Sequence, residues 1–339
     1  MIKKKIVCVA VLLFAVFCCT TKPLSAKTRY IQLNQWHKVA SLNNVKKIHY
    51  NKKKLKISKS RIKANSCGTY IISGKKKKKK YKLRIFVLPN NGKTRNAYWR
   101  NKTEYKNADY KHLSNHMFMT CLSTFDETSE QEYNLIHIIL SKPECFSVQY
   151  AGNRYGHPEE KTSDVCKQTK SILATNASYF CFNGYPAGKI HMQNGVIQKS
   201  GFSTGREVCI MKSGRIYSPP AGVSAERLQQ MGVRDILNTA DPILFQNGIR
   251  QNLNYDYSYP RTCLAMKSPL EYYIVVCGSG GYKNGMTYTQ LQDLLRSKGV
   301  TFARCLDGGG SSTLAIRGEL INIPACWEER PVVDYLLFK

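Results

Sequence analysis

Short segments that alternate between polar and apolar residues dominate residues 27–112. Residues 54–58 (KLKIS) alternate strictly, residues 68–72 (GTYII) follow, and residues 81–87 (YKLRIFV) alternate again. A period of two indicates strands with one buried face, and the glycine and lysines between the segments mark turns. The pattern predicts a small all-β sandwich, with the six lysines at 75–80 at the tip of a hairpin.

From about residue 126 onward, strands begin to alternate with helices. Thr287 and Gln290 have the spacing of a capping box, the following leucines lie on one helical face, and Gly299 is suited to end a helix. This pattern predicts a helix over about 288–298, and a second helix is expected over 224–231. We therefore expect an α+β domain, with mixed sheets and a few helices, over residues 113–339.

The connection at residues 307–312 (DGGGSS) has the composition of a ligand site. An apolar strand over about 300–306 leads into it, and a second strand leads away toward Arg317 and Gly318. Glycine is retained where φ must be positive or where a ligand approaches the main chain, and its N–H groups can line an anion-binding concavity. A tight turn between strands is the alternative, although a plain hairpin needs only about two loop residues.

The positive charge of the chain, +30 in total, is concentrated in one region. Residues 27–125 contain 26 Lys and Arg but only two acidic residues, Glu104 and Asp109, whereas residues 126–339 contain 22 basic and 20 acidic residues. Such a surface attracts polyanions. For an exported protein the expected partner is an anionic cell-wall polymer or surface polysaccharide rather than nucleic acid. A solvated surface that only aids solubility is the alternative.

The first 26 residues have the pattern of a signal peptide, with lysines at 3–5, an apolar run over 6–19 and small residues at Ser25 and Ala26. The run is shorter than the roughly 20 residues of a transmembrane helix. We therefore expect a secreted or surface-associated protein without a transmembrane span. Lipidation at Cys18 or Cys19 is the alternative, which the preceding residues 15–17 (AVF) disfavour.

Ten of the thirteen cysteines follow the expected signal peptide. An even number in an exported chain permits disulfides without requiring them. Cys277 and Cys305 lie in apolar segments that suit small buried side chains. No CxxC pair is present, so a zinc site has little support.

Several polar residues mark further candidate positions. Asn176 and Tyr179 follow an apolar strand and could hold sugar hydroxyls, with a simple strand-end turn as the alternative. Arg261 enters an apolar strand, and its planar guanidinium suits phosphate or carboxylate. A structural salt bridge to Asp241 or Asp307 is the other interpretation of Arg261.

The order of these motifs resembles the phosphodiester glycosidase family over about 165 residues. The shared segments are residues 176–180 (NASYF), 242–248 (PILFQNG), 260–262 (PRT), 284–287 (NGMT), 306–312 (LDGGGSS), 322–324 (NIP) and 329–332 (ERPV). The sequence departs from the family at Ala177, Ser178 and Met266, where glycine is usual. Residues 27–112 resemble a bacterial immunoglobulin-like module, which serves as a spacer or adhesion unit.

The resemblance implies hydrolysis of a glycosyl-1-phosphodiester such as an N-acetylglucosamine-1-phosphodiester. Asp307 would act as base or nucleophile, with Glu329 and Asp241 as further candidate carboxylates. The expected substrate-binding residues are Asn176, Tyr179, Arg261, Thr262, Gly308, Gly309, Gly310, Ser311, Ser312 and Arg330.

Three other functions remain open or compete less well. A non-catalytic wall or exopolysaccharide binder would keep the pocket without turnover, and a role in surface polysaccharide assembly is a third possibility. A serine hydrolase is disfavoured because residues 309–312 do not form a GxSxG elbow. No cofactor is expected. A calcium or magnesium ion bound by Asp307 and loop carbonyls is the alternative, although no Asp-rich ligand spacing supports it.

Overall fold

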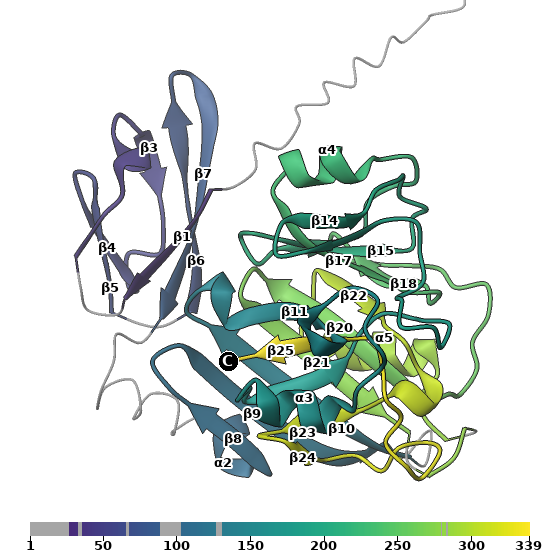
Figure 1. Ribbon diagram of the computed structural model, residues 1–339. Coiled ribbons are helices and arrows are strands. Elements are labelled where there is room, and N and C mark those ends of the chain that lie inside the picture. Colours follow the sequence, from purple (N-terminus) through teal and green to yellow (C-terminus); the bar gives the residue numbers. More distant parts are fainter. Residues whose placement is uncertain are drawn as a thin grey trace, which may run out of the picture. The chain divides into compact units, whose positions relative to one another are not determined.

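The computed structural model describes residues 27–32, 36–65, 68–88, 103–126, 131–278, 280–282 and 284–339. The expected signal peptide, residues 1–26, lies outside these described residues. The chain forms two compact units, Met1–Asn90 and Asn91–Lys339 (Figure 1). The domain boundary expected at residue 112 falls within strand β8 (Tyr110–Leu113), which pairs with β9 (Met117–Asp126) in the larger unit.

The described part of the smaller unit forms two small sheets. One has the order β1 (Lys27–Gln32), β7 (Lys79–Leu88), β6 (Gly68–Lys76), β3 (Lys46–His49), and the other β2 (His37–Lys38), β5 (Arg61–Ala64), β4 (Leu55–Ser58), with a 3-10 turn η1 at Ala40–Leu42. Their core contains Leu55, Ile62, Ile72 and Leu83, each at most 1% exposed. The immunoglobulin-like sandwich remains a prediction.

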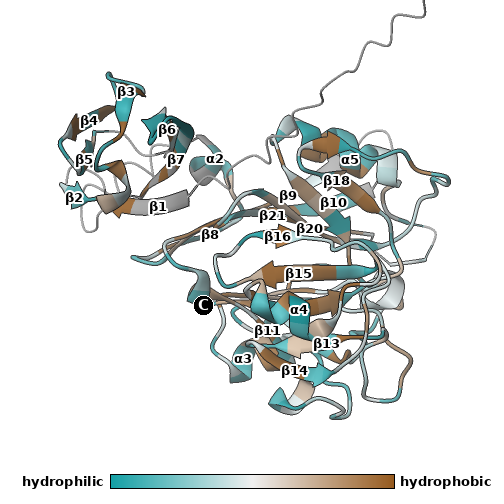
Figure 2. Ribbon diagram, turned by 90° about the horizontal axis from the view of Figure 1, so that it is seen from above, coloured by the Kyte–Doolittle hydropathy of each residue, from teal (hydrophilic) through white to brown (hydrophobic). Residues whose placement is uncertain are grey.

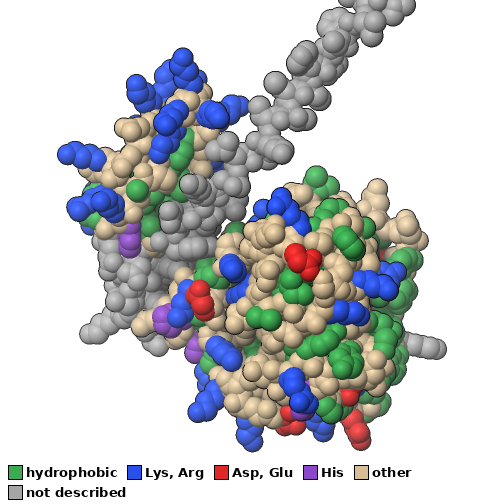
Figure 3. All heavy atoms as spheres, turned by 45° about the horizontal axis from the view of Figure 1, so that its top comes forward, with side chains coloured by type: hydrophobic (Ala, Val, Ile, Leu, Met, Phe, Trp, Pro, Cys, Tyr) green, Lys and Arg blue, Asp and Glu red, His purple; other side chains and the backbone are tan. Residues whose placement is uncertain are grey.

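The lysine run forms the end of the β6–β7 hairpin, as expected. Lys76 pairs with Lys79, and the two residues between them, Lys77 and Lys78, have positive φ angles of 48° and 63°. Residues 27–90 contain 20 Lys and Arg and no Asp or Glu. On the face drawn in Figure 3, basic side chains accordingly project from this unit in several directions.

The larger unit is built mainly of strands, with three sheets among its described residues. The first has the order β19 (Ile249–Arg250), β18 (Ile243–Gln246), β22 (Phe302–Cys305), β20 (Arg261–Ser268), β21 (Glu271–Cys277), β10 (Gln131–Leu140), β9, β8. The second has the order β11 (Phe146–Tyr150), β25 (Asp334–Phe338), β12 (Leu173–Asn176), β23 (Leu314–Ile316), β24 (Glu319–Leu320). The third has the order β14 (Val196–Lys199), β13 (His191–Gln193), β17 (Val233–Asn238), β15 (Glu207–Met211), β16 (Ile216–Tyr217).

The described helices of the larger unit are short. They are α2 (Thr103–Asn107), α3 (Thr162–Gln168), α4 (Ala225–Gln230) and α5 (Tyr288–Ser297), with 3-10 turns η2 (Pro143–Cys145), η3 (Ala151–Asn153) and η4 (Gly309–Ser311). Both helices expected from the sequence are present, and the capping box of α5 is formed by Thr287 and Gln290. No described helix is long and apolar enough to cross a membrane.

Strand β21 lies between β20 and β10 in the first sheet. All seven of its residues are buried, so both faces of this strand are packed. Helix α5 packs Leu291 and Leu295 into the same core as Val275 and Ala303. Figure 2 shows hydrophobic positions gathered on strands such as β15, with hydrophilic residues at many turns.

The glycine-rich connection joins two sheets. It leaves β22 of the first sheet and enters β23 of the second. The predicted strand-to-strand connection is therefore confirmed, but the two strands do not pair with one another. Asp307 lies in the connection where the chain passes from the first sheet to the second.

Candidate active site

The loop at residues 308–312 is a tight 3-10 turn held against residue 260. Gly309 N donates to Pro260 O at 2.9 Å, and Ser312 N donates to Gly309 O at 3.1 Å. Gly309 has a φ of 62°, in the left-handed region that glycine adopts readily. A Cβ at Gly308 would lie 2.7 Å from Pro260 O. Both glycines are thus required by the local backbone.

The main chain of Asp307 is fixed by the second sheet. Its N–H donates to Ala177 O at 2.9 Å, and its carbonyl oxygen accepts from Asn176 Nδ2 at 2.7 Å. The carboxylate accepts hydrogen bonds from the Ser311 hydroxyl and the Gly308 N–H. Its position and its hydrogen bonds are therefore set by elements from both sides of the loop.

Burial raises the pKa of Asp307 to about 7. The Ser311 hydrogen bond and the charge of Arg330 lower the pKa, whereas the charge of Asp241 raises it further. A carboxyl group with a pKa near neutrality can exchange a proton with a reactant at physiological pH. Asp307 thus has the electrostatic surroundings of an acid or base catalyst.

Asp241 lies between β17 and β18 and is the second carboxylate of this region. Tyr288 donates a hydrogen bond to its Oδ1 at 2.5 Å, and Arg261 Nη1 is 3.8 Å from the same oxygen. Burial raises the pKa of Asp241, while Tyr288, Arg261 and Arg304 act in the opposite direction. Its charge contributes to the raised pKa of Asp307, so the two carboxylates are electrostatically coupled.

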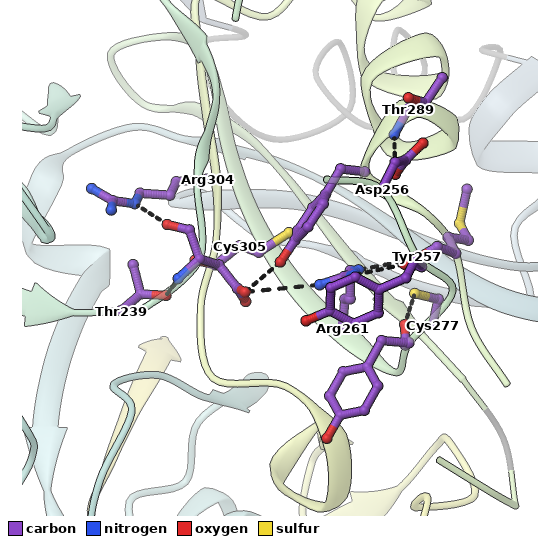
Figure 4. Close-up of polar contacts among 12 residues, drawn as sticks. Thr239, Asp256, Tyr257, Arg261, Cys277, Thr289, Arg304 and Cys305 are labelled. Carbon is purple, nitrogen blue, oxygen red and sulfur yellow. Dashed lines mark hydrogen bonds and ion pairs between the residues drawn. The ribbon is translucent and has the colours of Figure 1, made fainter. Parts of the chain in front are cut away.

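The Arg261 side chain is buried, and its guanidinium N–H groups contact other residues of the protein. Its side chain is 1% exposed, Nε donates to Met286 O at 3.0 Å and Nη2 donates to Tyr257 O at 2.8 Å. The guanidinium lies 3.6 Å from the centre of the Tyr288 ring, and Figure 4 shows it beside Tyr257. The salt bridge to Asp241 is therefore the alternative that the structure describes, and phosphate binding by Arg261 stays a prediction.

Arg330 reaches the glycine loop from the other side and is only partly buried. Its Nη2 donates to Tyr282 OH at 2.6 Å and its Nη1 to Ser311 Oγ at 3.4 Å. A Cβ at Gly310 would lie 2.3 Å from Nη2, so the loop backbone and the guanidinium are in direct contact. Arg330 is therefore better positioned than Arg261 to meet an anion arriving from solvent.

Glu329 turns away from this group and caps a helix. Its carboxylate accepts from Ser163 N at 2.8 Å and from Ser163 Oγ at 2.5 Å, at the first turn of α3. A carboxylate is favourable there because it satisfies a free N–H and the positive end of the helix dipole. In this structure Glu329 stabilises the first turn of α3, and its catalytic role stays an untested prediction.

Asn176 and Thr262 form a buried brace below the loop. Besides its bond to Asp307, Asn176 accepts at Oδ1 from Thr262 Oγ1 at 2.7 Å and from Thr313 N at 3.1 Å. Both side chains are fully buried. They support the site from within, whereas Tyr179 is 45% exposed.

Ser311 and Ser312 have different surroundings. Ser311 lies between Asp307 and Arg330, as described above. Ser312 is 1% exposed, and its Oγ has no hydrogen-bond partner among the described residues.

Aromatic residues that the sequence did not single out surround the loop. The Tyr259 hydroxyl would meet a Cβ at Gly309 at 2.7 Å, and the ring of Phe182 lies 5.4 Å from the Arg330 guanidinium. Phe182 and Trp327 are 68% and 72% exposed and have positive φ angles of 52° and 64°. The tyrosine-rich stretch 255–259 was the available signal in the sequence.

No group of three or more His, Cys, Asp or Glu side chains that could hold a metal ion occurs among the described residues. The nine described cysteines are free thiols, and Cys277 and Cys305 are buried in the core.

Comparisons with known proteins found similar sequences and a similar fold. The chain is 30% identical over 192 residues to the SPbeta prophage-derived uncharacterized protein YomE of Bacillus subtilis (strain 168), covering 52% of this chain and 29% of that protein. The structure is similar to the catalytic domain of zebrafish N-acetylglucosamine-1-phosphodiester alpha-N-acetylglucosaminidase auto-inhibited by its pro-peptide. That match has a TM-score of 0.51 and 18% identity, and it covers 68% of this chain and 86% of that one.

The structural match supports a β-rich fold for the larger unit, and the sequence match is more specific. The family model for phosphodiester glycosidase matches residues 169–339, which include Asn176, Asp241, Arg261, Asp307 and Arg330. The chain therefore belongs to the phosphodiester glycosidase family.

Proposed function

We propose that this protein hydrolyses a glycosyl-1-phosphodiester, with Asp307 as the general base. The observation that carries the proposal is the buried Asp307 carboxyl group, whose pKa is raised to about 7 beside the partly exposed Arg330. A general base works best when its pKa lies near the operating pH. Family membership supplies the reaction class, and the geometry supports the assignment of roles.

In the proposed step, Asp307 accepts a proton from a water molecule whose oxygen bonds to the anomeric carbon. The bond between that carbon and the phosphate oxygen breaks, and its electron pair leaves with the phosphate. The products are a free sugar and a phosphomonoester. Because phosphate is a good leaving group, the step places little demand on a general acid.

Asp241 would stabilise the positive charge that develops at the anomeric carbon. Tyr288 donates to its carboxylate, and Arg261 and Arg304 lie close enough to favour its ionised form. The same negative charge contributes to the raised pKa of Asp307. The proposal therefore assigns the two carboxylates different tasks.

Arg330 and the glycine loop would hold the phosphate. Arg330 offers guanidinium N–H groups, and its contact with Ser311 directs them to the loop. Charge-assisted hydrogen bonds to a leaving phosphate stabilise the transition state. Phe182 and Tyr282, which contact Arg330, would limit its movement.

The finer assignments of substrate and location are also proposals. We take an N-acetylglucosamine-1-phosphodiester as the first substrate to test, in a surface or extracellular glycan. The signal-peptide pattern of residues 1–26 supports export, and the basic unit at residues 27–90 would attach to an anionic wall polymer. If residues 27–90 act in this way, their retention on such a polymer falls as salt is added.

The test is turnover of a panel of sugar-1-phosphodiesters by wild type and by Asp307→Asn. Sugar release is expected from wild type and a loss of at least about 100-fold in the variant, the lower range for a catalytic acid or base. Asp293→Asn, an exposed carboxylate paired with Arg250, is the matched control and is expected to leave turnover unchanged. Full turnover by folded Asp307→Asn would refute the assignment. Binding without release from any substrate would favour a non-catalytic glycan-binding protein.

A further inference from the structure

A cavity of about 490 Å³ opens beside the turn at residues 181–188. It is formed by residues from three segments of the larger unit. Its lining residues are Tyr155, Cys181, Asn183, Tyr185, Pro186, Ala187, Gly188 and Lys199. None of these residues belongs to the carboxylate and arginine group described above.

Two tyrosine rings line the cavity. Tyr155 and Tyr185 meet edge to face, with ring centres 5.1 Å apart, and Tyr155 makes a second edge contact with the buried Tyr150 at 5.4 Å. A Cβ at Gly156 would lie 2.5 Å from the Tyr185 ring, so the backbone packs closely against it. Tyr185 is nevertheless 45% exposed. The pair therefore presents a supported aromatic surface to solvent.

Polar groups accompany the rings. Lys199 Nζ donates to Gly188 O at 2.8 Å, and an ammonium group has three N–H donors. Asn183 Oδ1 accepts from Tyr185 N at 3.2 Å, which leaves the side-chain amide of Asn183 beside the cavity. Aromatic surfaces with a few placed polar groups are characteristic of small-molecule sites. A sugar ring combines apolar C–H faces with hydroxyl groups and fits this lining.

The turn that lines the cavity also reaches the candidate active site. Phe180 and Pro186 form a β-bridge that closes the turn, and Phe182 within it faces the Arg330 guanidinium. Ala187 N donates to Tyr179 O at 2.7 Å, and Tyr179 is two residues beyond Ala177, the backbone partner of Asp307. One short turn thus contributes residues both to the surroundings of Arg330 and to the cavity.

We propose that this cavity is a second saccharide subsite, which binds a sugar residue joined to the one that is cleaved. The sugar ring packs on Tyr185, and Lys199 binds a hydroxyl or phosphate oxygen. The inference rests on the proposed function for the identity of the glycan. Its consequence is that the protein prefers an oligosaccharide or polymer to an isolated sugar phosphodiester.

Cys181 provides a test of binding that does not depend on turnover. It is an exposed thiol in the cavity wall, whereas Cys326 is partly buried and outside the cavity. The full chain is treated with a thiol reagent, and modification at each cysteine is followed by peptide mass spectrometry. The probes are chitotriose and N-acetylglucosamine 1-phosphate. At least one probe is expected to slow modification of Cys181 and to leave the rate at Cys326 unchanged.

Variants test the assigned contacts. Tyr185→Ala is expected to weaken the protection of Cys181 by about three- to tenfold, the range of an aromatic stacking contact. Tyr185→Phe retains the ring and is expected to keep the protection. Lys199→Gln should weaken protection by the phosphorylated probe more than by chitotriose. Tyr110→Ala removes an exposed tyrosine of β8 and is the control for loss of a surface ring.

Kinetics separate this inference from the proposed function. With active protein, Tyr185→Ala is expected to raise KM for a disaccharide-1-phosphodiester while leaving KM and kcat for the monosaccharide substrate unchanged. Turnover by wild type without protection of Cys181 by either probe would overturn the subsite alone. Protection without turnover would uphold a saccharide site and overturn the proposed hydrolysis.

Discussion

The side-chain amide of Asn176 donates a hydrogen bond to the carbonyl oxygen of Asp307 at 2.7 Å, joining positions 131 residues apart. The contact ties the end of β12 to the end of β22, which belong to different sheets. Because it holds the main chain and not the carboxylate, it fixes the position of Asp307 and leaves the carboxylate oxygens available to a substrate.

Asn176→Ala is therefore expected to reduce both stability and turnover. It leaves the carbonyl of Asp307 and the hydroxyl of Thr262 without their buried partner, which costs about 1–3 kcal/mol for each unsatisfied group. Chemical denaturation measures the stability, and kcat is measured on the same preparation. Asn252→Ala, at an exposed position, is expected to change stability by less than about 0.5 kcal/mol. Equal stability and equal kcat of the two variants would contradict the supporting role of Asn176.

The pH dependence of kcat/KM tests the role of Asp307. Its pKa is raised to about 7, and a general base must be ionised, so activity is expected to fall as pH decreases through that value. Asp241→Asn removes a charge that raises this pKa and should move the acid limb to lower pH. Arg330→Gln removes a charge that lowers it and should move the limb to higher pH. Both shifts are measured on the residual activity of the variants. If the fall in kcat/KM at low pH occurs at the wild-type pH in both variants, the electrostatic coupling of Asp307 to Asp241 and Arg330 is refuted.

Glu329→Gln is expected to retain turnover while Asp307→Asn loses it. The Glu329 carboxylate is bonded to Ser163 at the first turn of α3, so its loss weakens a helix cap. Loss of a capping side chain costs about 0.5–2 kcal/mol, which a shift in the thermal midpoint would report. A loss of kcat in Glu329→Gln comparable to that of Asp307→Asn would instead restore Glu329 as a catalytic carboxylate.

Gly309→Ala and Gly310→Ala are expected to differ in kind. Gly309 has positive φ, so alanine there costs about 1–2 kcal/mol of backbone strain and lowers the thermal midpoint. At Gly310 the new methyl group would meet the Arg330 guanidinium at 2.3 Å. This movable side chain would be displaced, which is expected to raise KM with a smaller loss of stability. The reverse pattern would show that Arg330 does not bind the substrate.

His137 is expected to make stability depend on pH. Its Nδ1 lies 2.7 Å from Glu104 Oε1 and its Nε2 lies 3.2 Å from Glu271 Oε1, while Lys267 contacts Glu271 and Tyr273 stacks on the imidazole. Although burial lowers the pKa of His137, the two carboxylates outweigh it and raise the pKa above 6.5. The stabilisation is thus fully present below pH 6.5 and is lost as pH rises through the folded-state pKa.

The glutamates set the other limit of this window. Burial raises their pKa values, but His137 outweighs burial and brings them below 4.5, so their contribution is present above pH 4.5 and lost as pH falls through the lowered values. Denaturation midpoints of wild type and His137→Gln, measured across this range, should differ most between pH 4.5 and 6.5. A difference that does not vary with pH would contradict an ionised histidine.

Local signals predicted much of the larger unit. The capping residues of α5, the helix α4 and the strands around Asp307 all follow from spacing within a few residues. The glycine loop was found because three consecutive glycines are costly unless the backbone requires them. Here Gly309 has positive φ, a Cβ at Gly308 would meet the backbone oxygen of Pro260, and a Cβ at Gly310 would meet the Arg330 side chain.

Partners distant in the sequence could not be assigned in the same way. Arg261 and Glu329 were candidates because of their charge, yet one is buried against Tyr288 and the other caps α3, and these neighbours are set by tertiary packing. The contacts of Arg330 with Tyr282 and Phe182 likewise join separate loops. The sequence identified chemically capable residues, whereas the fold determines which of them share one site.

The absence of Asp and Glu from residues 27–90 has a consequence for how the proposed attachment and the proposed hydrolysis would be controlled. The side-chain charge of this unit comes only from Lys, Arg and His, so it stays strongly positive from mildly acidic to mildly alkaline conditions. Turnover, by contrast, is expected to follow ionisation of Asp307 near neutrality. Ionic strength would then govern where the protein resides, and acidity would govern how fast it works there, so that a change in one leaves the other process unaltered.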